Sequence, residues 1–116
     1  MRAYETKDAR QDKMLILKSY PKATQSKLQR LVIDILHDPR NLYTVGNPET
    51  LKHSEKEMWS RELNEKDRIV YGIEPGCNYN MPNEKEIVVF YQYLGKCPLP
   101  FSPGYEQSKK EIFFEK

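Results

Sequence analysis

The spacing of apolar residues changes along the chain from a helical period to an alternating one, and this change limits the folds available to it. Apolar side chains first recur at i, i+3, i+4, i+7 and i+8, at Leu28, Leu31, Val32, Ile35 and Leu36. This spacing is the stripe of an amphipathic helix. Further along, short runs alternate between apolar and polar residues, which is typical of strands. The combination predicts an α+β fold, with an N-terminal strand and a helical hairpin packed on a small antiparallel sheet.

Pro21 divides the helical part of the chain into two helices. We expect residues 2–5 to form an edge strand, and Thr6 to cap a helix over residues 7–20. The second helix should end at Asp38, because the proline that follows disfavours helical geometry in the residue before it. The continuous apolar run Met14–Leu17 is ambiguous, since it fits a buried strand as well as a helix.

Three segments of the second half are expected to form strands. The first two cover residues 58–63 and 68–73, and the polar turn between them indicates a hairpin. The third, over residues 86–94, is rich in β-branched and aromatic side chains. Its alternation predicts one face with Ile87, Val89, Tyr91 and Tyr93, and an opposite face with Val88, Phe90, Gln92 and Leu94.

The last part of the chain has a different composition. Three prolines lie within residues 97–103, which predicts an extended connector rather than a strand. A short helix is expected over residues 105–114. We therefore expect one domain over residues 1–97, followed by a proline-rich connector and a short C-terminal helix or tail over residues 98–116.

Composition and charge narrow the class of protein. The chain has 116 residues, of which 38% are hydrophobic and 31% charged, so a single globular domain is expected. No apolar run approaches the roughly 20 residues of a membrane span, and the charged start lacks the apolar stretch of a signal peptide. We expect a cytoplasmic protein that does not bind a membrane. The two cysteines and two histidines are not spaced as a metal site.

The first third of the chain is basic. Within residues 1–33, Lys and Arg outnumber Asp and Glu by eight to three. A basic stripe on the helices would suit a phosphate backbone. The alternative is a solvated helix face, which charge alone favours.

The segment 48–74 resembles the centre of YoeB-type bacterial toxins, which are related to RelE. That family carries three short motifs in the same order and at matching spacing. In this chain they are Pro48-Glu49-Thr50-Leu51-Lys52-His53, Trp59-Ser60-Arg61 and Arg68-Ile69-Val70-Tyr71. The resemblance covers roughly residues 1–95, and its middle quarter is the most specific part.

The resemblance implies an endoribonuclease that cuts messenger RNA on the ribosome. In this reaction an RNA 2′-hydroxyl attacks the adjacent phosphate, and no metal, cofactor or covalent enzyme intermediate is required. Glu49 matches the general base and Arg68 the cation that stabilises the reacting phosphate, a role that suits the planar guanidinium. Lys52 and Arg61 match positions that hold the RNA. Trp59 is expected in the core, with stacking on a base as the alternative.

Each assignment has a structural alternative. The alternative for Glu49 is a cap of the turn after Pro48, and the alternative for Arg68 is an ordinary cross-strand partner of Glu62 or Glu65. The joint occurrence of the three motifs favours the functional assignment for both residues.

The chain departs from the family at the end of the last strand. Leu94 and Gly95 stand where YoeB-type toxins end in a His-Tyr pair, and Glu62 replaces a second arginine. Leucine cannot donate a proton, and losing a general acid typically lowers a rate by ~10² to 10⁴. A carboxylate at position 62 would repel an RNA backbone.

The C-terminal end instead resembles RelE-type toxins. That relative has Gly-Lys-Arg after its last strand and then a functional tyrosine at the head of a terminal helix. Gly95 and Lys96 match the first two residues, Cys97 replaces the arginine, and Tyr105 is the candidate tyrosine. Tyr105 would act as the acid or stack on a base; the alternative is an aromatic residue that pins the tail to the sheet.

Three functions therefore compete. The first is the toxin of a type II toxin–antitoxin system that acts as a ribosome-dependent endoribonuclease. Its expected partners are a cognate antitoxin, the ribosome and mRNA, in a homodimer or a toxin–antitoxin hetero-oligomer. The second is a catalytically degenerate binding module of the same fold. The third is a ParE-like inhibitor of DNA gyrase, against which the match of residues 49–53 argues.

Overall fold

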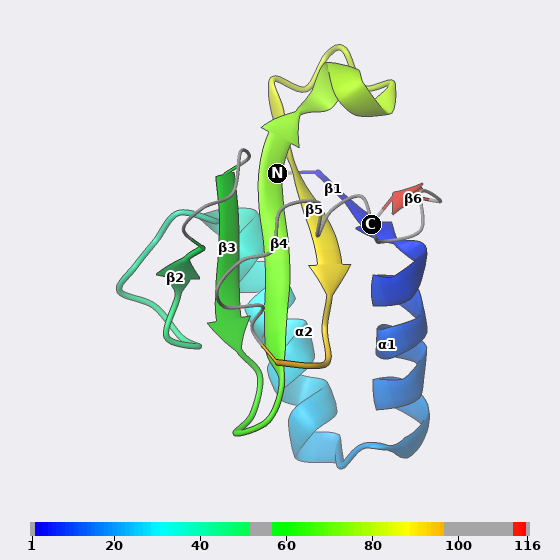
Figure 1. Cartoon of the computed structure of the whole chain (residues 1–116), viewed down its shortest axis with the longest axis vertical. Helices are drawn as coiled ribbons and strands as arrows, with labels where there is room; N and C mark the ends of the chain where they lie inside the picture. The colour runs from blue at the N-terminus through cyan, green and yellow to red at the C-terminus, as the bar shows by residue number, and fades with distance from the viewer. Residues whose placement is uncertain (1, 52–56, 97–112, 116) are drawn as a thin grey trace.

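The computed structural model describes residues 2–51, 57–96 and, as a strand, 113–115. Its elements run in the order β1 (Ala3–Thr6), α1 (Lys7–Ser19), α2 (Lys22–His37), β2 (Glu49–Thr50), β3 (Glu57–Glu62), β4 (Arg68–Pro75), the 3₁₀ helix η1 (Gly76–Tyr79), β5 (Glu86–Gln92) and β6 (Phe113–Glu115). The α+β fold with a helical hairpin on a sheet is confirmed (Figure 1). In the described part of the chain, no helix is long and apolar enough to cross a membrane.

The described strands form one sheet in the order β2-β3-β4-β5-β1-β6. The sheet is mixed, because β1 runs parallel to β5 while the other neighbouring pairs are antiparallel. The expected antiparallel pairing is therefore confirmed at the other pairs and wrong only between β1 and β5. The N-terminal strand is also not an edge strand, since β1 lies between β5 and β6. The helical hairpin that follows β1 carries the chain across the sheet to β2, at the far edge of the described strands.

Local sequence explains where the helices begin and end. The Thr6 side chain accepts a hydrogen bond from the Ala9 amide (3.1 Å), which confirms it as the N-cap of α1. Helix α1 ends at Ser19, just before Tyr20 and Pro21. Helix α2 ends at His37, with Asp38 as its C-cap before Pro39. Both ends lie within one residue of the positions expected from the prolines.

Each face of the sheet carries a hydrophobic core. The helix-side core joins both helices to β3, β4 and β5, through Ala3, Ala9, Ile16, Leu28, Leu31, Ile35, Trp59, Leu63, Ile69, Tyr71, Ile73, Val88, Phe90 and Tyr93. The opposite face carries a second core of Leu51, Met58, Val70, Met81, Ile87, Val89 and Tyr91. Figure 1 shows α2 behind β3 and β4, with α1 beside it. The candidate catalytic residues lie on the face of the second core.

A β-bulge shifts the end of β5. Val70 pairs with Gln92 and Tyr71 with Phe90, so Tyr91 has no residue opposite it on β4. A bulge places an extra residue in one strand and changes its alternation from that point on. The expected faces are therefore confirmed up to Tyr91, but Tyr93 packs in the helix-side core with Val88 and Phe90. Its predicted position beside Tyr91 is wrong.

The C-terminal residues differ from the expected helix where the structure describes them. Phe113–Glu115 is a strand that pairs antiparallel with β1. The prediction of a helix is therefore wrong at residues 113 and 114. Its remaining residues, including Tyr105, and the proline-rich connector lie outside the described residues.

Candidate active site

Arg68 is the first residue of β4, and its guanidinium is held in a fixed position. Nε donates to Ser60 Oγ (3.1 Å), and one terminal nitrogen donates to the Asn47 carbonyl (3.0 Å). The Arg68 side chain is 16% exposed. A guanidinium restrained by two neutral oxygens keeps its positive charge and its remaining N–H groups for an anion.

Two carboxylates flank this guanidinium. Glu49 Oε2 lies 3.9 Å from an Arg68 terminal nitrogen, and Glu62 Oε2 lies 3.6 Å from the other. The Glu49 side chain is 54% exposed. The structure therefore brings Glu49 and Arg68 together, as the motif predicted. It also gives Arg68 the cross-strand partner Glu62, as the structural alternative expected.

Glu49 reaches Arg68 because of a tight turn before it. Gly46 and Asn47 both have positive φ, 92° and 47°. At Gly46 a Cβ atom would lie 2.8 Å from a Leu31 methyl carbon, so only glycine fits without a shift. The Gly46 carbonyl accepts from the Glu62 amide (2.6 Å), which fixes the turn to the end of β3. Strand β2 then pairs Glu49 with Ser60.

The end of β5 borders the site from the other side. The Arg68 amide donates to the Gly95 carbonyl (2.8 Å), and the Gln92 side-chain amide donates to the Arg68 carbonyl (3.2 Å). Leu94, in contrast, packs against the helix-side core. At Leu94 and Gly95, the positions where the resemblance implied a His-Tyr pair, the contact with Arg68 is made by the Gly95 carbonyl.

Arg61 is not placed to hold RNA. Its side chain is fully buried on the helix side of the sheet, opposite the face that carries Arg68. It forms a salt bridge with Asp34 and donates to the Tyr71 hydroxyl (3.2 Å) and the Asp38 carbonyl (3.2 Å). Arg61 therefore ties the C-terminal end of α2 to the sheet, and contact with RNA would require it to leave the core.

Burial and the Arg61 contacts act on Asp34 in opposite directions. Desolvation raises the pKa of Asp34, whereas hydrogen bonds from Arg61 and Thr44 and the charge of Arg61 lower it. The net effect holds the Asp34 pKa below its ordinary value of 3.8. The ion pair is therefore formed at neutral pH.

The remaining predicted residues have different outcomes. Trp59 is confirmed as a core residue, and its indole nitrogen donates to Glu57 (2.9 Å). Lys52 and Tyr105 lie outside the described residues. Among the residues that the structure describes, no group of His, Cys, Asp and Glu is arranged to hold a metal ion.

Sequence reasoning missed three residues that shape the site. Ser60 and Asn47 position the Arg68 side chain, and Gln92 holds its backbone. Strand alternation offers a signal for Ser60, since Ser60 and Glu62 share a face and Glu62 pairs with Arg68. The roles of Asn47 and Gln92 depend on a turn and a bulge, for which the sequence alone offers no comparable signal.

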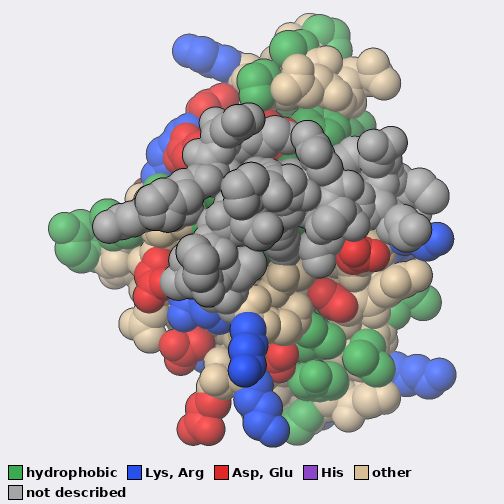
Figure 2. All heavy atoms as spheres, in the orientation of Figure 1, with side chains coloured by type: hydrophobic (Ala, Val, Ile, Leu, Met, Phe, Trp, Pro, Cys, Tyr) green, Lys and Arg blue, Asp and Glu red, His purple; other side chains and the backbone are tan. Residues whose placement is uncertain are grey.

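The sheet face in front of the helices is not uniformly basic. Figure 2 shows acidic and basic side chains next to one another around its margin. The charges seen around this face are therefore mixed rather than of one sign.

Solved structures share this architecture. The "YoeB/ParE toxin from Agrobacterium tumefaciens" is 20% identical, with a TM-score of 0.64 over 84% of this chain and 100% of its own. The YoeB dimer from Staphylococcus aureus is 20% identical, with a TM-score of 0.63 over 82% of this chain and 95% of its own. The YoeB-YefM complex from Staphylococcus aureus is 18% identical, with a TM-score of 0.60 over the same shares. The fold is that of the small YoeB and ParE toxins.

The sequence specifies the family within this class. The model of the YoeB-like toxins of bacterial type II toxin-antitoxin systems matches residues 6–88, which include Glu49 and Arg68. The chain belongs to this family. Among curated proteins, none matches the sequence.

Proposed function

We propose that this toxin is an endoribonuclease that cuts mRNA on the ribosome, with Glu49 and Arg68 as its catalytic residues. The observation that carries the proposal is the closeness of the two side chains, with Glu49 Oε2 3.9 Å from an Arg68 terminal nitrogen. Glu49 is open to solvent, and Arg68 is held by Ser60 and Asn47. A carboxylate that accepts a proton beside a fixed guanidinium is the pair that phosphodiester cleavage by an internal hydroxyl requires.

The proposed reaction proceeds by attack of the RNA 2′-hydroxyl on the adjacent phosphorus. Glu49 takes the hydroxyl proton as the O2′–P bond forms, and Arg68 stabilises the additional negative charge on the phosphorane oxygens. The P–O5′ bond then breaks, and O5′ accepts a proton. The products are a 2′,3′-cyclic phosphate and a 5′-hydroxyl end. Tyr105 is the proposed donor of that proton or a base-stacking ring, and Lys52 the proposed RNA contact.

The proposed partners follow from the family and its solved structures. The "YoeB-YefM complex from Staphylococcus aureus" is a toxin–antitoxin pair, and another solved structure is a YoeB dimer. We propose that this chain likewise binds a cognate antitoxin and forms a homodimer or a toxin–antitoxin hetero-oligomer. The ribosome, mRNA and a cytoplasmic location belong to the same proposal.

A second candidate, a binding module without nuclease activity, is favoured by two observations. Leu94, at the position where the family has a histidine, packs against the helix-side core. Glu62 Oε2 lies 3.6 Å from an Arg68 terminal nitrogen, where it would compete with a phosphate. Such a module would bind its antitoxin or the ribosome without cutting RNA.

The deciding experiment adds the purified protein to ribosomes that translate a defined mRNA, and locates cuts by primer extension. Discrete cuts with a 2′,3′-cyclic phosphate are expected, and they should disappear when the nucleotide before the cut carries a 2′-deoxyribose. Ribosome binding without cuts would favour the degenerate module. A supercoiling assay with purified gyrase serves as a control, because inhibition there would favour the ParE-like function instead.

A further inference from the structure

The backbone at the start of β4 is held by the turn that follows β5. The regular ladder between the two strands begins with Val70 and Gln92, two residues after Arg68. Before that point, Arg68 and the residue preceding it engage both backbone groups of Gly95. The Gly95 amide donates to the Asp67 carboxylate (2.9 Å), and the Gly95 carbonyl accepts from the Arg68 amide (2.8 Å). Asp67 and Gly95 therefore extend the hold of β5 on β4 as far as Arg68.

Gly95 adopts a backbone conformation that favours glycine, since its φ is +105°. The Gln92 side-chain amide spans the turn, because it donates to the carbonyls of both Arg68 (3.2 Å) and Lys96 (3.3 Å). A Cβ atom at Gly95 would lie 3.4 Å from the Gln92 nitrogen. The cost of a side chain at this position therefore comes from the backbone conformation more than from crowding.

A second carboxylate holds the two residues before Gly95. Asp12 Oδ2, on helix α1, accepts from the amides of Tyr93 (3.1 Å) and Leu94 (3.2 Å). Three consecutive amides are thus bound by carboxylates, two by Asp12 and one by Asp67. Hydrogen bonds to ionised groups are stronger than those between neutral groups. We name this arrangement of Asp12, Asp67 and residues 93–95 the carboxylate clamp.

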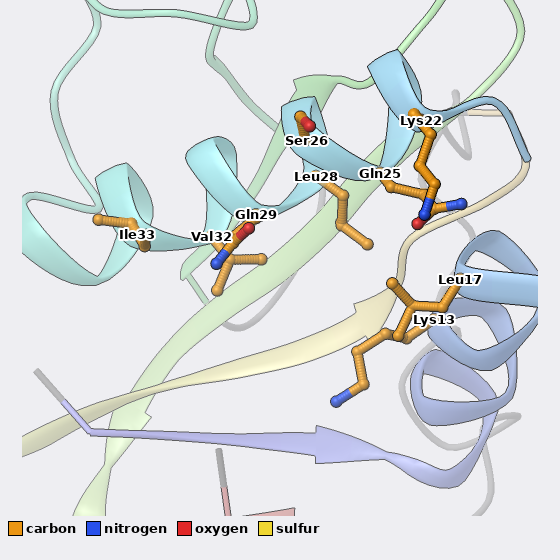
Figure 3. A pocket seen from close by; sticks show the side chains of 9 residues that line it. All are labelled: Lys13, Leu17, Lys22, Gln25, Ser26, Leu28, Gln29, Val32 and Ile33. Carbon is orange, nitrogen blue, oxygen red and sulfur yellow. The ribbon is translucent and has the colours of Figure 1, made fainter.

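Helix α1 is itself fixed to the sheet beside Asp12. Figure 3 shows Lys13 extending from α1 toward β1, where its ammonium donates to the buried Glu5 carboxylate (2.8 Å). The same carboxylate accepts from the Tyr93 hydroxyl (2.8 Å). Glu5 therefore joins α1, β1 and the end of β5 at one point, and Asp12 holds its two amides from a firmly anchored helix.

We propose that Asp67 is a positioning residue for Arg68, which acts through Gly95 within the carboxylate clamp. This inference rests on the endoribonuclease function proposed above and adds a residue to its machinery. The Arg68 guanidinium extends from the backbone that the clamp holds, so a shift of that backbone moves the cation away from the reacting phosphate. Small displacements of a catalytic group cost much of its effect on a rate.

A carboxylate this close to Arg68 has an alternative role in proton transfer. In the structure, however, both Asp67 oxygens accept hydrogen bonds from the protein, Oδ1 from the Gly95 amide (2.9 Å) and Oδ2 from the Asn64 side chain (3.0 Å). Asp67→Asn separates the two roles. Asparagine retains an oxygen that can accept from the Gly95 amide, but it cannot take up a proton at neutral pH.

The first part of the test does not require cleavage, because it follows the Arg68 side chain by NMR in the isotope-labelled full chain. In Asp67→Ala, the Nε–H signal of Arg68, which is bonded to Ser60, should move toward that of a solvated arginine. The amides of Gly95 and Arg68 should exchange at least about tenfold faster, as expected for loss of a hydrogen bond to a charged group. Asp67→Asn should retain most of the wild-type behaviour.

A matched control separates this effect from a general loss of stability. Glu57→Gln alters a carboxylate that bonds Arg40 and Trp59 from the first residue of β3, whereas Arg68 pairs with Glu62 at the other end of that strand. The Arg68 signals should stay unchanged in Glu57→Gln. Thermal unfolding confirms that each variant is folded at the temperature of the measurement.

The second part measures single-turnover cleavage on programmed ribosomes. Asp67→Ala and Gly95→Ala should each lower the rate by about tenfold, the size expected for one hydrogen bond to a charged group. Asp67→Asn should recover most of the rate, and binding to the ribosome should change less than the rate does. In an Arg68→Lys background, Asp67→Ala should lower the rate little further, because both changes act through one cation.

Three outcomes would overturn the proposal. One is an Arg68 Nε–H signal that Asp67→Ala leaves unchanged. Another is a rate loss in Asp67→Asn as large as in Asp67→Ala, which would assign Asp67 to proton transfer. The third is full additivity of Asp67→Ala with Arg68→Lys. A wild type that cuts no RNA would contradict the endoribonuclease function instead, while the NMR comparison would still show whether Asp67 places Arg68.

Discussion

Arg61 and Arg68 lie on neighbouring strands of one hairpin, yet they have opposite environments. Side chains alternate along β3, so Arg61 faces the helices, while Ser60 and Glu62 face the other side. Arg68 pairs with Glu62 and therefore shares its face. A match to the family motif identifies the residue types but not their faces. Counting the alternation back from Arg68 would have placed Arg61 in the core.

Removing the charge of Asp34 should destabilise the fold, because it leaves the buried Arg61 without its anion. We expect Asp34→Asn to lower the free energy of unfolding by about 2 kcal/mol at pH 7, the usual size for a hydrogen bond to a charged group. Urea unfolding measures it. Cleavage by the folded variant should be unchanged, since Arg61 does not reach the candidate site.

The contribution of the Asp34–Arg61 ion pair to folding stability should depend on pH in acid. The Asp34 pKa is lower in the folded protein than its ordinary value of 3.8, so its contribution to stability is complete above that value. It is lost as the pH falls through the lower, folded pKa. The stability difference between wild type and Asp34→Asn should therefore shrink below about pH 4. A constant difference down to pH 2 would contradict the pairing.

Ser60 should act by positioning Arg68. Its hydroxyl accepts from Arg68 Nε, and its own side chain is buried, so direct contact with RNA is not expected. Ser60→Ala should lower the cleavage rate by about tenfold, as expected for loss of one charge-assisted hydrogen bond. Ser60→Thr, which retains a hydroxyl, should recover part of the rate. Equal rates for Ser60→Ala and wild type would show that Arg68 needs no such support.

Glu62 should oppose the reaction by competing with the RNA phosphate for Arg68. Its Oε2 lies 3.6 Å from an Arg68 terminal nitrogen. Glu62→Gln should therefore tighten binding to programmed ribosomes by a few fold at low salt, with a smaller effect at high salt because screening weakens the charge. Nitrocellulose-filter binding at two salt concentrations measures this. A weaker complex for Glu62→Gln would indicate instead that Glu62 positions Arg68.

At the scale of elements, cap and turn residues were easier to predict than strand pairing. Thr6 and the two prolines fixed the limits of the helices, because their effects are local. The parallel pairing of β1 with β5 joins residues as distant as Ala3 and Val88, and the bulge at Tyr91 depends on the pairing of Val70 with Gln92. No local pattern encodes either feature. The run Met14–Leu17 resolved as a helix that buries only Ile16.

The N-cap of α1 should contribute measurably to stability. The Thr6 hydroxyl accepts from the Ala9 amide and donates to the Tyr91 carbonyl (3.3 Å), so it links the helix to the bulge of β5. We expect Thr6→Ala to lower the free energy of unfolding by about 1–2 kcal/mol, and Thr6→Ser by less. Thermal and urea unfolding check this, and equal losses in the two variants would assign the effect to the buried methyl group.

At the scale of the whole molecule, the candidate site joins three segments that are distant in sequence. The turn at Gly46–Asn47 positions Glu49, and the β3–β4 hairpin carries Ser60 and Arg68. Gln92, at the end of β5, donates a hydrogen bond to the Arg68 backbone. The motif predicted that Glu49 and Arg68 would be functional, and the fold brings them together. It did not predict the supports of Arg68, because these depend on a turn and a bulge formed by tertiary pairing.

The most direct test of this account is the single-turnover rate of mRNA cleavage on programmed ribosomes for wild type, Glu49→Gln and Arg68→Lys, with Glu62→Gln as the control. Loss of the base or of the planar guanidinium should lower the rate by about 100-fold or more, whereas Glu62→Gln should not lower it. All three side chains are partly exposed, so the variants should fold. Cleavage by Glu49→Gln and Arg68→Lys at the wild-type rate would contradict the assignment of this pair as the catalytic centre.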